Sequence, residues 1–329
     1  MPSDCVFLTG ATGFIGAHVA GELVAAGYHV RALTRARQSA RQTAAPNIEW
    51  VTGDMCRAGE LARALEGCSY LVHCAALYSF APRDRAALRR VNVAGTASLL
   101  EAARIAGVKR AVVTSSSATV GPARNDLPAT ESDHAPQAHG SAYHRSKLEQ
   151  ERAAMAARLP VVLLLPTAPV GPGDWKPTPT GRLVLDFARG RIPARPSAGG
   201  LNLVAVEDVA RAHVAALERG SIGERYIAGG ENMTFDRVWE LLAEVTGRAA
   251  PRLRVPYGIS LSAAYVDEMR CRLQPRSVPT VPVEGVRMSR ERMYVDSAKA
   301  VRELGYRPSA VRDALARAVA WYRANGYVA

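Results

Sequence analysis

Short apolar runs alternate with longer amphipathic stretches along the first half of the chain. We expect strands in the apolar runs, which are "CVFLTG", "HVRAL", "IEWVTGD", "YLVHCAA", "RAVVTSSS" and "PVVLLLP". The stretches between them carry helical periodicity. Strands that are apolar on both faces and alternate with helices are typical of a parallel sheet covered on both sides. The pattern therefore predicts an α/β fold with a doubly wound parallel sheet, a Rossmann fold.

The pattern changes after Pro166, where "PTAPVGPGDWKPTPTG" is rich in proline and glycine and predicts a loop of fixed shape. Shorter helical and strand patterns follow it. We therefore expect a dinucleotide-binding domain over 1–166 and a smaller, mixed α/β substrate-binding lobe over 167–329, partly interleaved with the sheet. A ligand is expected in the cleft between them.

Three glycines join the first expected strand to the first expected helix. They are Gly10, Gly13 and Gly16 in "LTGATGFIG". Glycine permits a positive φ in a tight turn and lets the backbone approach a pyrophosphate, which the N–H groups of the helix N-terminus then bind. A glycine triplet alone also occurs in plain turns, but the strand before it and the helix after it favour dinucleotide binding.

The end of the second strand indicates which dinucleotide is bound. NAD-binding chains place Asp or Glu there, whereas this chain has Thr34, with Arg31, Arg35 and Arg37 around it. Arginines suit a 2′-phosphate, so we expect NADP, with NAD as the alternative. In "GDM", Asp54 can accept a hydrogen bond from adenine or simply cap the next helix.

Tyr143 and Lys147 lie four residues apart in "YHRSK", on one face of an expected helix. A free phenol titrates near pH ~10, and an adjacent ammonium favours its anionic form. Such a phenol can exchange a proton with a substrate while a nicotinamide carries the hydride. The hydroxyls of "TSSS" end a strand at the same expected edge of the sheet, where a serine can bond the same substrate oxygen.

Composition excludes several classes of protein. The five cysteines are scattered, without metal-ligand spacing, so we expect no metal and no disulfide framework. The net charge of +12 comes from dispersed arginines, so we expect no nucleic-acid partner and at most peripheral membrane contact. The longest apolar run is too short to span a bilayer, and the N-terminus enters a strand at once. These features predict a cytoplasmic protein with a small-molecule substrate.

Six segments occur in the order and spacing of the extended short-chain dehydrogenases/reductases, the epimerase/dehydratase superfamily: "TGATGFIG", "GDM", "HCAA", "VNVAGT", "VVTSSSATVG" and "YHRSK". The resemblance covers almost the whole chain. Segments such as "LNLVAVEDVARAH" and "AKAVRELGYRP" resemble the dihydroflavonol-reductase branch, and within it the hopanoid-associated sugar epimerases. The family also implies a homodimer.

The resemblance implies roles for individual residues. Tyr143 is the expected acid/base, Lys147 its partner and Ser116 the hydroxyl that faces the carbonyl, with Ser117 as the alternative in register. Trp175 and Lys176 are expected to shape the substrate side. Besides Tyr143, Lys147 and Gly16, the expected cofactor contacts are Gly10, Thr12, Gly13, Phe14, Ile15, Arg35, Asp54, Met55, Ala75, Ala76, Leu77, Asn92, Thr114, Pro166 and Thr167.

Two departures bear on the substrate. Nucleotide-sugar epimerases resemble one another in an Asn and an Arg that bind the nucleoside diphosphate, but here those positions hold Ala168 and Leu201. Arg287, Arg290 and Arg292 remain as phosphate ligands or as surface charges. We therefore expect an NADP(H)-dependent oxidoreductase acting on a ketone or secondary alcohol of a small or sugar-like substrate. A sugar epimerase that retains its cofactor and a non-catalytic dinucleotide sensor are the alternatives.

Overall fold

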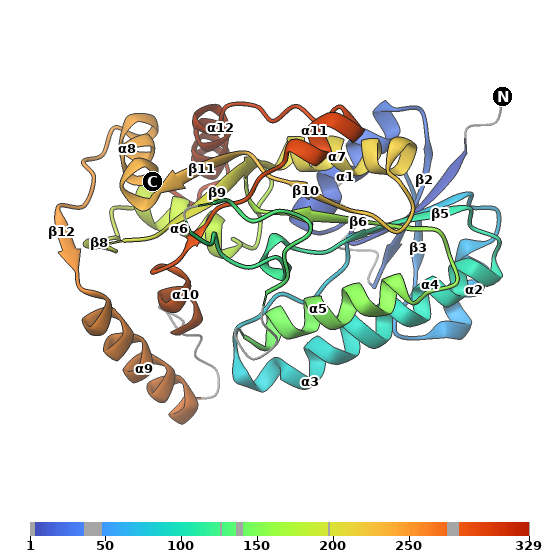
Figure 1. Ribbon diagram of the computed structural model, residues 1–329, viewed down its shortest axis with the longest axis horizontal. Helices are drawn as coiled ribbons and strands as arrows, with labels where there is room; N and C mark the ends of the chain where they lie inside the picture. The colour runs from blue at the N-terminus through green and yellow to red at the C-terminus, as the bar shows by residue number, and fades with distance from the viewer. Residues whose placement is uncertain are drawn as a thin grey trace.

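The computed structural model describes residues 4–35, 48–125, 127–135, 141–196, 198–274 and 283–328. Seven parallel strands form the main sheet, in the spatial order β10-β6-β5-β4-β1-β2-β3 (Figure 1). The predicted doubly wound α/β fold is confirmed. The strands are β1 (Cys5–Thr9), β2 (His29–Thr34), β3 (Ile48–Thr52), β4 (Tyr70–His73), β5 (Arg110–Thr114), β6 (Val161–Pro166) and β10 (Arg225–Ala228).

Helices cover both faces of this sheet because successive side chains of each strand point to opposite faces. Val6 and Leu8 of β1 belong to the apolar cluster shared with α1 and α7, whereas Phe7 belongs to the cluster shared with α2 and α4. The helices of the first face are α1 (Phe14–Ala25), α7 (Val206–Arg219) and α11 (Ala298–Leu304), and those of the second are α2 (Ala58–Leu65), α4 (Thr96–Ile105) and α5 (Ala142–Met155).

The segment between β4 and β5 departs from the single regular helix that its sequence predicts over 84–107. It contains the 3₁₀ turn η2 (Pro82–Asp84), α3 (Arg85–Leu88), the π-helical segment η3 (Arg89–Gly95) and then α4. A π-helical segment often marks a functional position in a helix. This segment contains Asn92, one of the expected cofactor contacts.

A second lobe is built on a four-stranded sheet of β7 (Ala168–Val170), β9 (Gly200–Ala205), β11 (Glu231–Thr234) and β13 (Arg292–Met293). Its main apolar cluster includes side chains of α6 (Pro179–Ala188), α8 (Phe235–Thr246) and α12 (Val311–Ala324). The remaining elements are the pair β8 (Ala194–Pro196) and β12 (Leu253–Val255), and the helices α9 (Tyr257–Leu273) and α10 (Val283–Met288). Within the described residues, no helix is both long and apolar enough to cross a membrane.

Candidate active site

The glycine-rich turn connects β1 to α1 at the carboxyl edge of the main sheet. Gly10 has φ +82°, and a Cβ there would lie 2.6 Å from the backbone nitrogen of Ala75. A Cβ on Gly16 would lie 2.1 Å from the carbonyl oxygen of Gly10. Gly13 is the N-cap of α1, and no side chain caps this helix, so its first N–H groups face the turn. The turn therefore requires glycine, and it offers a backbone cradle suited to a pyrophosphate. Thr12 is exposed, and Phe14 and Ile15 begin the helix half-buried.

The groups expected around the adenosine lie beyond β2 and β3. Thr34 is buried, whereas Arg35 is exposed. Burial raises the pKa of the Cys56 thiol, and the positive charge of Arg35 lies close enough to oppose this increase. Asp54 accepts the Cys56 N–H at 3.0 Å within the turn before α2. The N-cap of α2 is Arg57 and no side chain caps this helix, so Asp54 is not the helix cap that the second interpretation of "GDM" proposed. Met55 is buried within the apolar cluster of the sheet.

Arg31 has a structural role. Its Nε lies 2.8 Å from Glu49 Oε2, and its Nη1 donates to the carbonyl oxygens of Ala64 and Glu66 at the end of α2. Its guanidinium is therefore engaged at the opposite end of β2 from Thr34. Arg37 lies outside the described residues. Of the two described arginines around Thr34, Arg31 is engaged elsewhere and Arg35 remains for a phosphate.

Asn92 fixes the backbone of the segment after β4. Its Oδ1 accepts the Leu77 N–H at 2.7 Å, and its Nδ2 donates to the Leu77 carbonyl at 3.0 Å and to Ser146 Oγ at 3.0 Å. The asparagine thus links η3 to Leu77 and to helix α5. It holds the backbone of Leu77 in place, a role that the sequence gave no reason to expect.

Thr114, Pro166 and Thr167 end β5 and β6 at the same edge. Thr114 Oγ1 bonds His213 Nε2 at 2.8 Å, and the Thr114 carbonyl faces Lys147. Thr167 Oγ1 is buried and lacks a protein partner in the described structure. A buried hydroxyl without a partner is costly, so a ligand that bonded Thr167 would remove this cost.

Lys147 is 1% exposed and lies on α5, beneath the ends of β4 and β5. Its Nζ donates to the Thr114 carbonyl at 2.9 Å and to Gln150 Oε1 at 2.5 Å. Burial lowers the pKa of this lysine to about 8, because the charged form loses hydration. Both of these hydrogen-bond partners are neutral, so no carboxylate of the described residues bonds the ammonium directly, although the charge of Glu151 acts on it from a distance.

Tyr143 lies one helical turn before Lys147, and its ring is covered by other aromatic side chains. The ring centroids of Tyr78 and Phe80 lie 4.3 and 6.1 Å from that of Tyr143. Burial raises the pKa of the Tyr143 phenol, and a hydrogen bond with the Ser116 side chain acts in the opposite direction. Tyr143, Ser116 and Lys147 are thus brought together at the sheet edge. Ser117, the alternative in register, begins the 3₁₀ turn η4 (Ser117–Thr119).

A chain of buried hydrogen bonds extends from Lys147 to β1. Gln150 accepts from Lys147 through Oε1, and its Nε2 donates to Thr96 Oγ1 at 3.0 Å. Thr96 Oγ1 also lies 2.8 Å from His73 Nε2, and His73 Nδ1 lies 2.7 Å from Thr9 Oγ1. Burial lowers the pKa of His73 to about 3, which keeps the ring neutral. Sequence reasoning missed this chain, although Thr9, His73 and Thr96 lie in its motifs.

Glu151, a buried carboxylate on α5, forms an ion pair with Arg225. Glu151 accepts from Ser115 Oγ and, at 2.7 Å, from Thr119 Oγ1, and its Oε2 lies 3.3 Å from Arg225 Nη2. Arg225 comes from β10 and also donates to the carbonyl oxygens of Glu131 and Asp133. Glu151 therefore ties α5 to the edge strand of the sheet.

The expected substrate residues lie on the loop after β7. Trp175 is 41% exposed and stacks edge-on against Trp321 of α12, with ring centroids 4.7 Å apart. Asp174 fixes the shape of this loop by accepting from Thr178 N at 2.8 Å and from Tyr322 OH at 3.3 Å. Lys176 is exposed.

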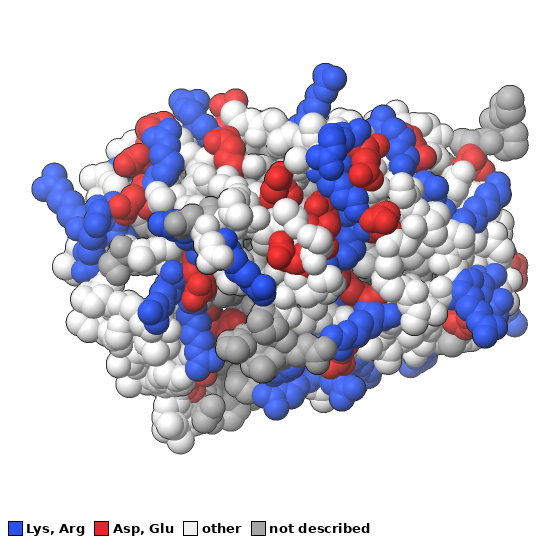
Figure 2. All heavy atoms as spheres, viewed as in Figure 1, with Lys and Arg blue, Asp and Glu red and all other residues white. Residues whose placement is uncertain are grey.

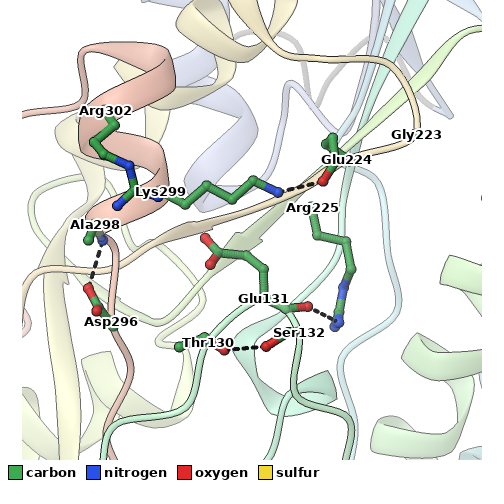
Figure 3. A pocket seen from close by; sticks show the side chains of 10 residues that line it. All are labelled: Thr130, Glu131, Ser132, Gly223, Glu224, Arg225, Asp296, Ala298, Lys299 and Arg302. Atoms are coloured by element: carbon green, nitrogen blue, oxygen red, sulfur yellow. Dashed lines mark hydrogen bonds and ion pairs between the residues drawn. The ribbon is translucent and has the colours of Figure 1, made fainter.

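A cavity of about 380 Å³ lies apart from these residues, between α11, the start of β10 and the loop around Glu131. Figure 3 shows the side chains that line it. Its charged groups are largely paired with each other or with backbone: Lys299 Nζ lies 2.5 Å from Glu224 Oε2, and Glu131 Oε1 accepts the Ile227 N–H at 2.8 Å. Tyr143 and Lys147 are not among its lining residues. The predicted catalytic residues therefore lie outside this cavity.

Comparison with known proteins agrees with this fold and motif set. The model of the NAD dependent epimerase/dehydratase family matches residues 6–229. The chain belongs to this family. The predicted membership of the extended short-chain dehydrogenases/reductases, and hence the prediction of an enzyme that uses a nicotinamide dinucleotide, is confirmed.

Relatives cover nearly the whole chain. A putative dihydroflavonol 4-reductase of Synechocystis is 42% identical over 99% of this chain and 96% of its own length. Sterol demethylase protein B of Methylococcus capsulatus is 36% identical over 98% and 99%. The crystal structure of PA4631, a nucleoside-diphosphate-sugar epimerase from Pseudomonas aeruginosa, superimposes with a TM-score of 0.83 at 26% identity, covering 99% of both chains.

Proposed function

We propose that the chain is an NADP(H)-dependent oxidoreductase that interconverts a ketone and a secondary alcohol on an apolar, lipid-like substrate. The observation that carries this proposal is the juxtaposition of Tyr143, Ser116 and Lys147 beneath an aromatic cover. The names of the relatives support it, because one is named a putative dihydroflavonol 4-reductase and another a sterol demethylase protein.

The chain's own residues supply a suitable cofactor site. The glycine turn and the N-terminus of α1 would hold the pyrophosphate, and the unpartnered Thr167 hydroxyl would bond the polar end of the nicotinamide half. When bound, the cofactor supplies or accepts the hydride. Arg35 beyond the buried Thr34, with no acidic residue at that position, favours a 2′-phosphate and hence NADP.

Proton transfer is the task of Tyr143. In the reductive direction, its hydroxyl gives a proton to the carbonyl oxygen while the hydride reaches the carbonyl carbon, and Ser116 donates a hydrogen bond to the same oxygen. The phenolate that remains is stabilised by the Lys147 ammonium, which neutral partners hold in place. In the oxidative direction, the phenolate accepts the proton from the alcohol.

The surroundings of Tyr143 favour an apolar substrate over a nucleotide sugar. Tyr78, which is 46% exposed, and Phe80 present ring faces and edges beside the phenol. Ala168 and Leu201 stand where nucleotide-sugar epimerases carry a polar and a charged side chain. Loss of two such contacts to a diphosphate removes about 1.5–3 kcal/mol each. Flat apolar rings or acyl chains suit this surface better.

The test compares the native protein with Tyr143→Phe and with Tyr28→Phe, a matched control at a half-exposed site far from Lys147. Hydride transfer is followed with NADPH and NADH on a ketosteroid, a long-chain keto lipid and UDP-glucose. We expect turnover with NADPH on a lipid ketone, a loss of at least ~100-fold in Tyr143→Phe with nearly unchanged NADPH affinity, and no loss in Tyr28→Phe. Full activity in Tyr143→Phe would refute the assignment of the acid. Epimerisation of UDP-glucose with a retained cofactor would replace the reductase by the epimerase.

A further inference from the structure

Helix α9 exposes an apolar face. Ile259, Val266, Met269 and Leu273 follow one another at spacings of seven, three and four residues, which places them on one side of the helix. Their exposed fractions are 63, 71, 57 and 80%. The opposite side packs through Ala264 against Val283 and Val286 of α10. A surface helix usually exposes polar side chains to solvent, whereas α9 exposes apolar side chains on its outer side.

This apolar face is concentrated rather than scattered. In the part of the chain that the structure describes, thirteen large apolar side chains are exposed, and five of them belong to α9, with Leu253 as a sixth just before it. The projection at the lower left of Figure 2, where Figure 1 places α9, accordingly contains few charged atoms. Contiguous exposed apolar surface of this kind is typical of an interaction site.

Arginines border the same helix. Arg287 Nη2 donates to Tyr265 OH at 2.7 Å, and the Arg290 guanidinium lies 5.3 Å from the centre of the Tyr257 ring. Both arginines are exposed, and both are held against α9 by aromatic side chains. Arg270 adds a third guanidinium near the end of the helix, 2.7 Å from Asp267. The acidic groups nearby are Asp267, Glu268 and Glu284, which are partly buried.

We propose that α9 docks on the surface of an anionic lipid bilayer, with its apolar stripe in the acyl boundary and Arg287 and Arg290 among the lipid phosphates. A helix with an apolar face beside basic side chains lies in the membrane interface in this manner, and each cation near the surface adds to the attraction. The net charge of +12 acts in the same direction. A second copy of the chain suits this face less well, because a two-fold contact would bring the arginines of both copies together.

The docking face is joined to the predicted active site. Glu284 of α10 accepts the Ser141 N–H at 3.1 Å, and its Oε1 lies 3.3 Å from His144 Nδ1, next to Tyr143. Through α10, the docking face is thus linked to the helix that carries Tyr143. The docking itself does not depend on the reaction and is measured without any substrate.

The experiment measures cosedimentation of the full chain with vesicles of phosphatidylglycerol and phosphatidylcholine in equal parts, and with vesicles of phosphatidylcholine alone. Val266→Glu introduces a charge into the stripe, and Ile105→Glu is the matched control, since Ile105 is 65% exposed on α4. Arg287→Gln combined with Arg290→Gln removes the two bordering charges. Circular dichroism and analytical ultracentrifugation of each protein establish folding and oligomeric state.

We expect the native chain and Ile105→Glu to bind the anionic vesicles alike, and Val266→Glu and the double arginine variant to bind at least ~10-fold more weakly. Vesicles of phosphatidylcholine alone should bind weakly. Failure of the native chain to bind anionic vesicles would overturn the proposal, as would equal binding by Val266→Glu and Ile105→Glu. A native dimer that Val266→Glu dissociates, without vesicle binding by the native chain, would assign the face to a second copy instead.

Discussion

Replacing Gln150 by Met tests whether the buried hydrogen-bond chain sets the charge of Lys147. Gln150 Oε1 accepts a hydrogen bond from the Lys147 ammonium and so favours the charged form. Met has a similar length but cannot accept in this way. Thr96 Oγ1 would keep its bonds to the Asn92 carbonyl and His73 Nε2, so the change falls mainly on the lysine.

The size of the effect follows from the hydrogen bond that is lost. A hydrogen bond to a charged group contributes about 1.5–3 kcal/mol, and one pKa unit corresponds to about 1.4 kcal/mol. Lys147 has a pKa of about 8, already lowered by burial. Removing an acceptor disfavours the ammonium further, so we expect the pKa to fall by about one to two units. Above the new pKa, the neutral amine no longer stabilises the Tyr143 phenolate.

The assay is the pH dependence of kcat/KM for ketone reduction with saturating NADPH. We expect the native rate to decline as pH rises through about 8, and the Gln150→Met rate to decline at a pH about one to two units lower. Glu149 lies beside Gln150 on α5 and forms an exposed ion pair with Arg89. Glu149→Gln should therefore leave the pH of the decline unchanged. A Gln150→Met enzyme that is folded and has the native pH profile would refute the reasoning, because Gln150 would then have no influence on the lysine.

Two further predictions concern other parts of the main domain. Gly16→Ala should weaken NADPH binding by at least ~10-fold in fluorescence titration, because its Cβ would lie 2.1 Å from the Gly10 carbonyl oxygen and force the turn open. Gly21→Ala is the control and should bind NADPH normally, because its Cβ meets nothing within 4 Å. Equal NADPH affinities of the two variants would contradict the role of the glycine turn in binding the pyrophosphate. Cys5 should react with iodoacetamide at pH 7 at least ~10-fold faster than Cys74, because a hydrogen bond from Cys68, 2.9 Å away, lowers the pKa of Cys5 while burial raises that of Cys74 to about 12. Mass spectrometry of the labelled peptides checks the order, and preferential labelling of Cys74 would contradict it.

The features that sequence predicted well depend on local pattern. Alternation of apolar strands and amphipathic helices sets the sheet, and the glycine spacing sets the turn between β1 and α1. Tyr143 and Lys147 share a helical face because of their spacing alone. The parallel sheet then brings the ends of β1, β4, β5 and β6 to one edge, so residues far apart in sequence could be expected to meet there.

The features that sequence did not predict depend on tertiary partners. The π-helical turn at Asn92 is accompanied by hydrogen bonds to Leu77 and Ser146, which no helical periodicity reveals. Arg31 is used by Glu49 and the end of α2, although its position near Thr34 in sequence suggested a phosphate ligand. The aromatic cover of Tyr143 comes from Tyr78 and Phe80, in a segment without regular structure whose course only the fold determines.

The hydrogen bonds along α5 explain how one helix can hold a buried carboxylate and a buried ammonium without a direct ion pair between them. Glu151 has its own cation in Arg225 and two hydroxyl donors, so its charge is satisfied on the side of the edge strand. Lys147, four residues earlier, is held by a carbonyl and an amide, which fix its position, while the charge of Glu151 acts on it only from a distance. In a buried site, an ammonium that is not directly bonded to a carboxylate can stabilise a neighbouring phenolate. The pairing of Glu151 with Arg225 is therefore a condition for the proposed role of Lys147: without that arginine, the carboxylate would compete with the Tyr143 phenolate for the same charge.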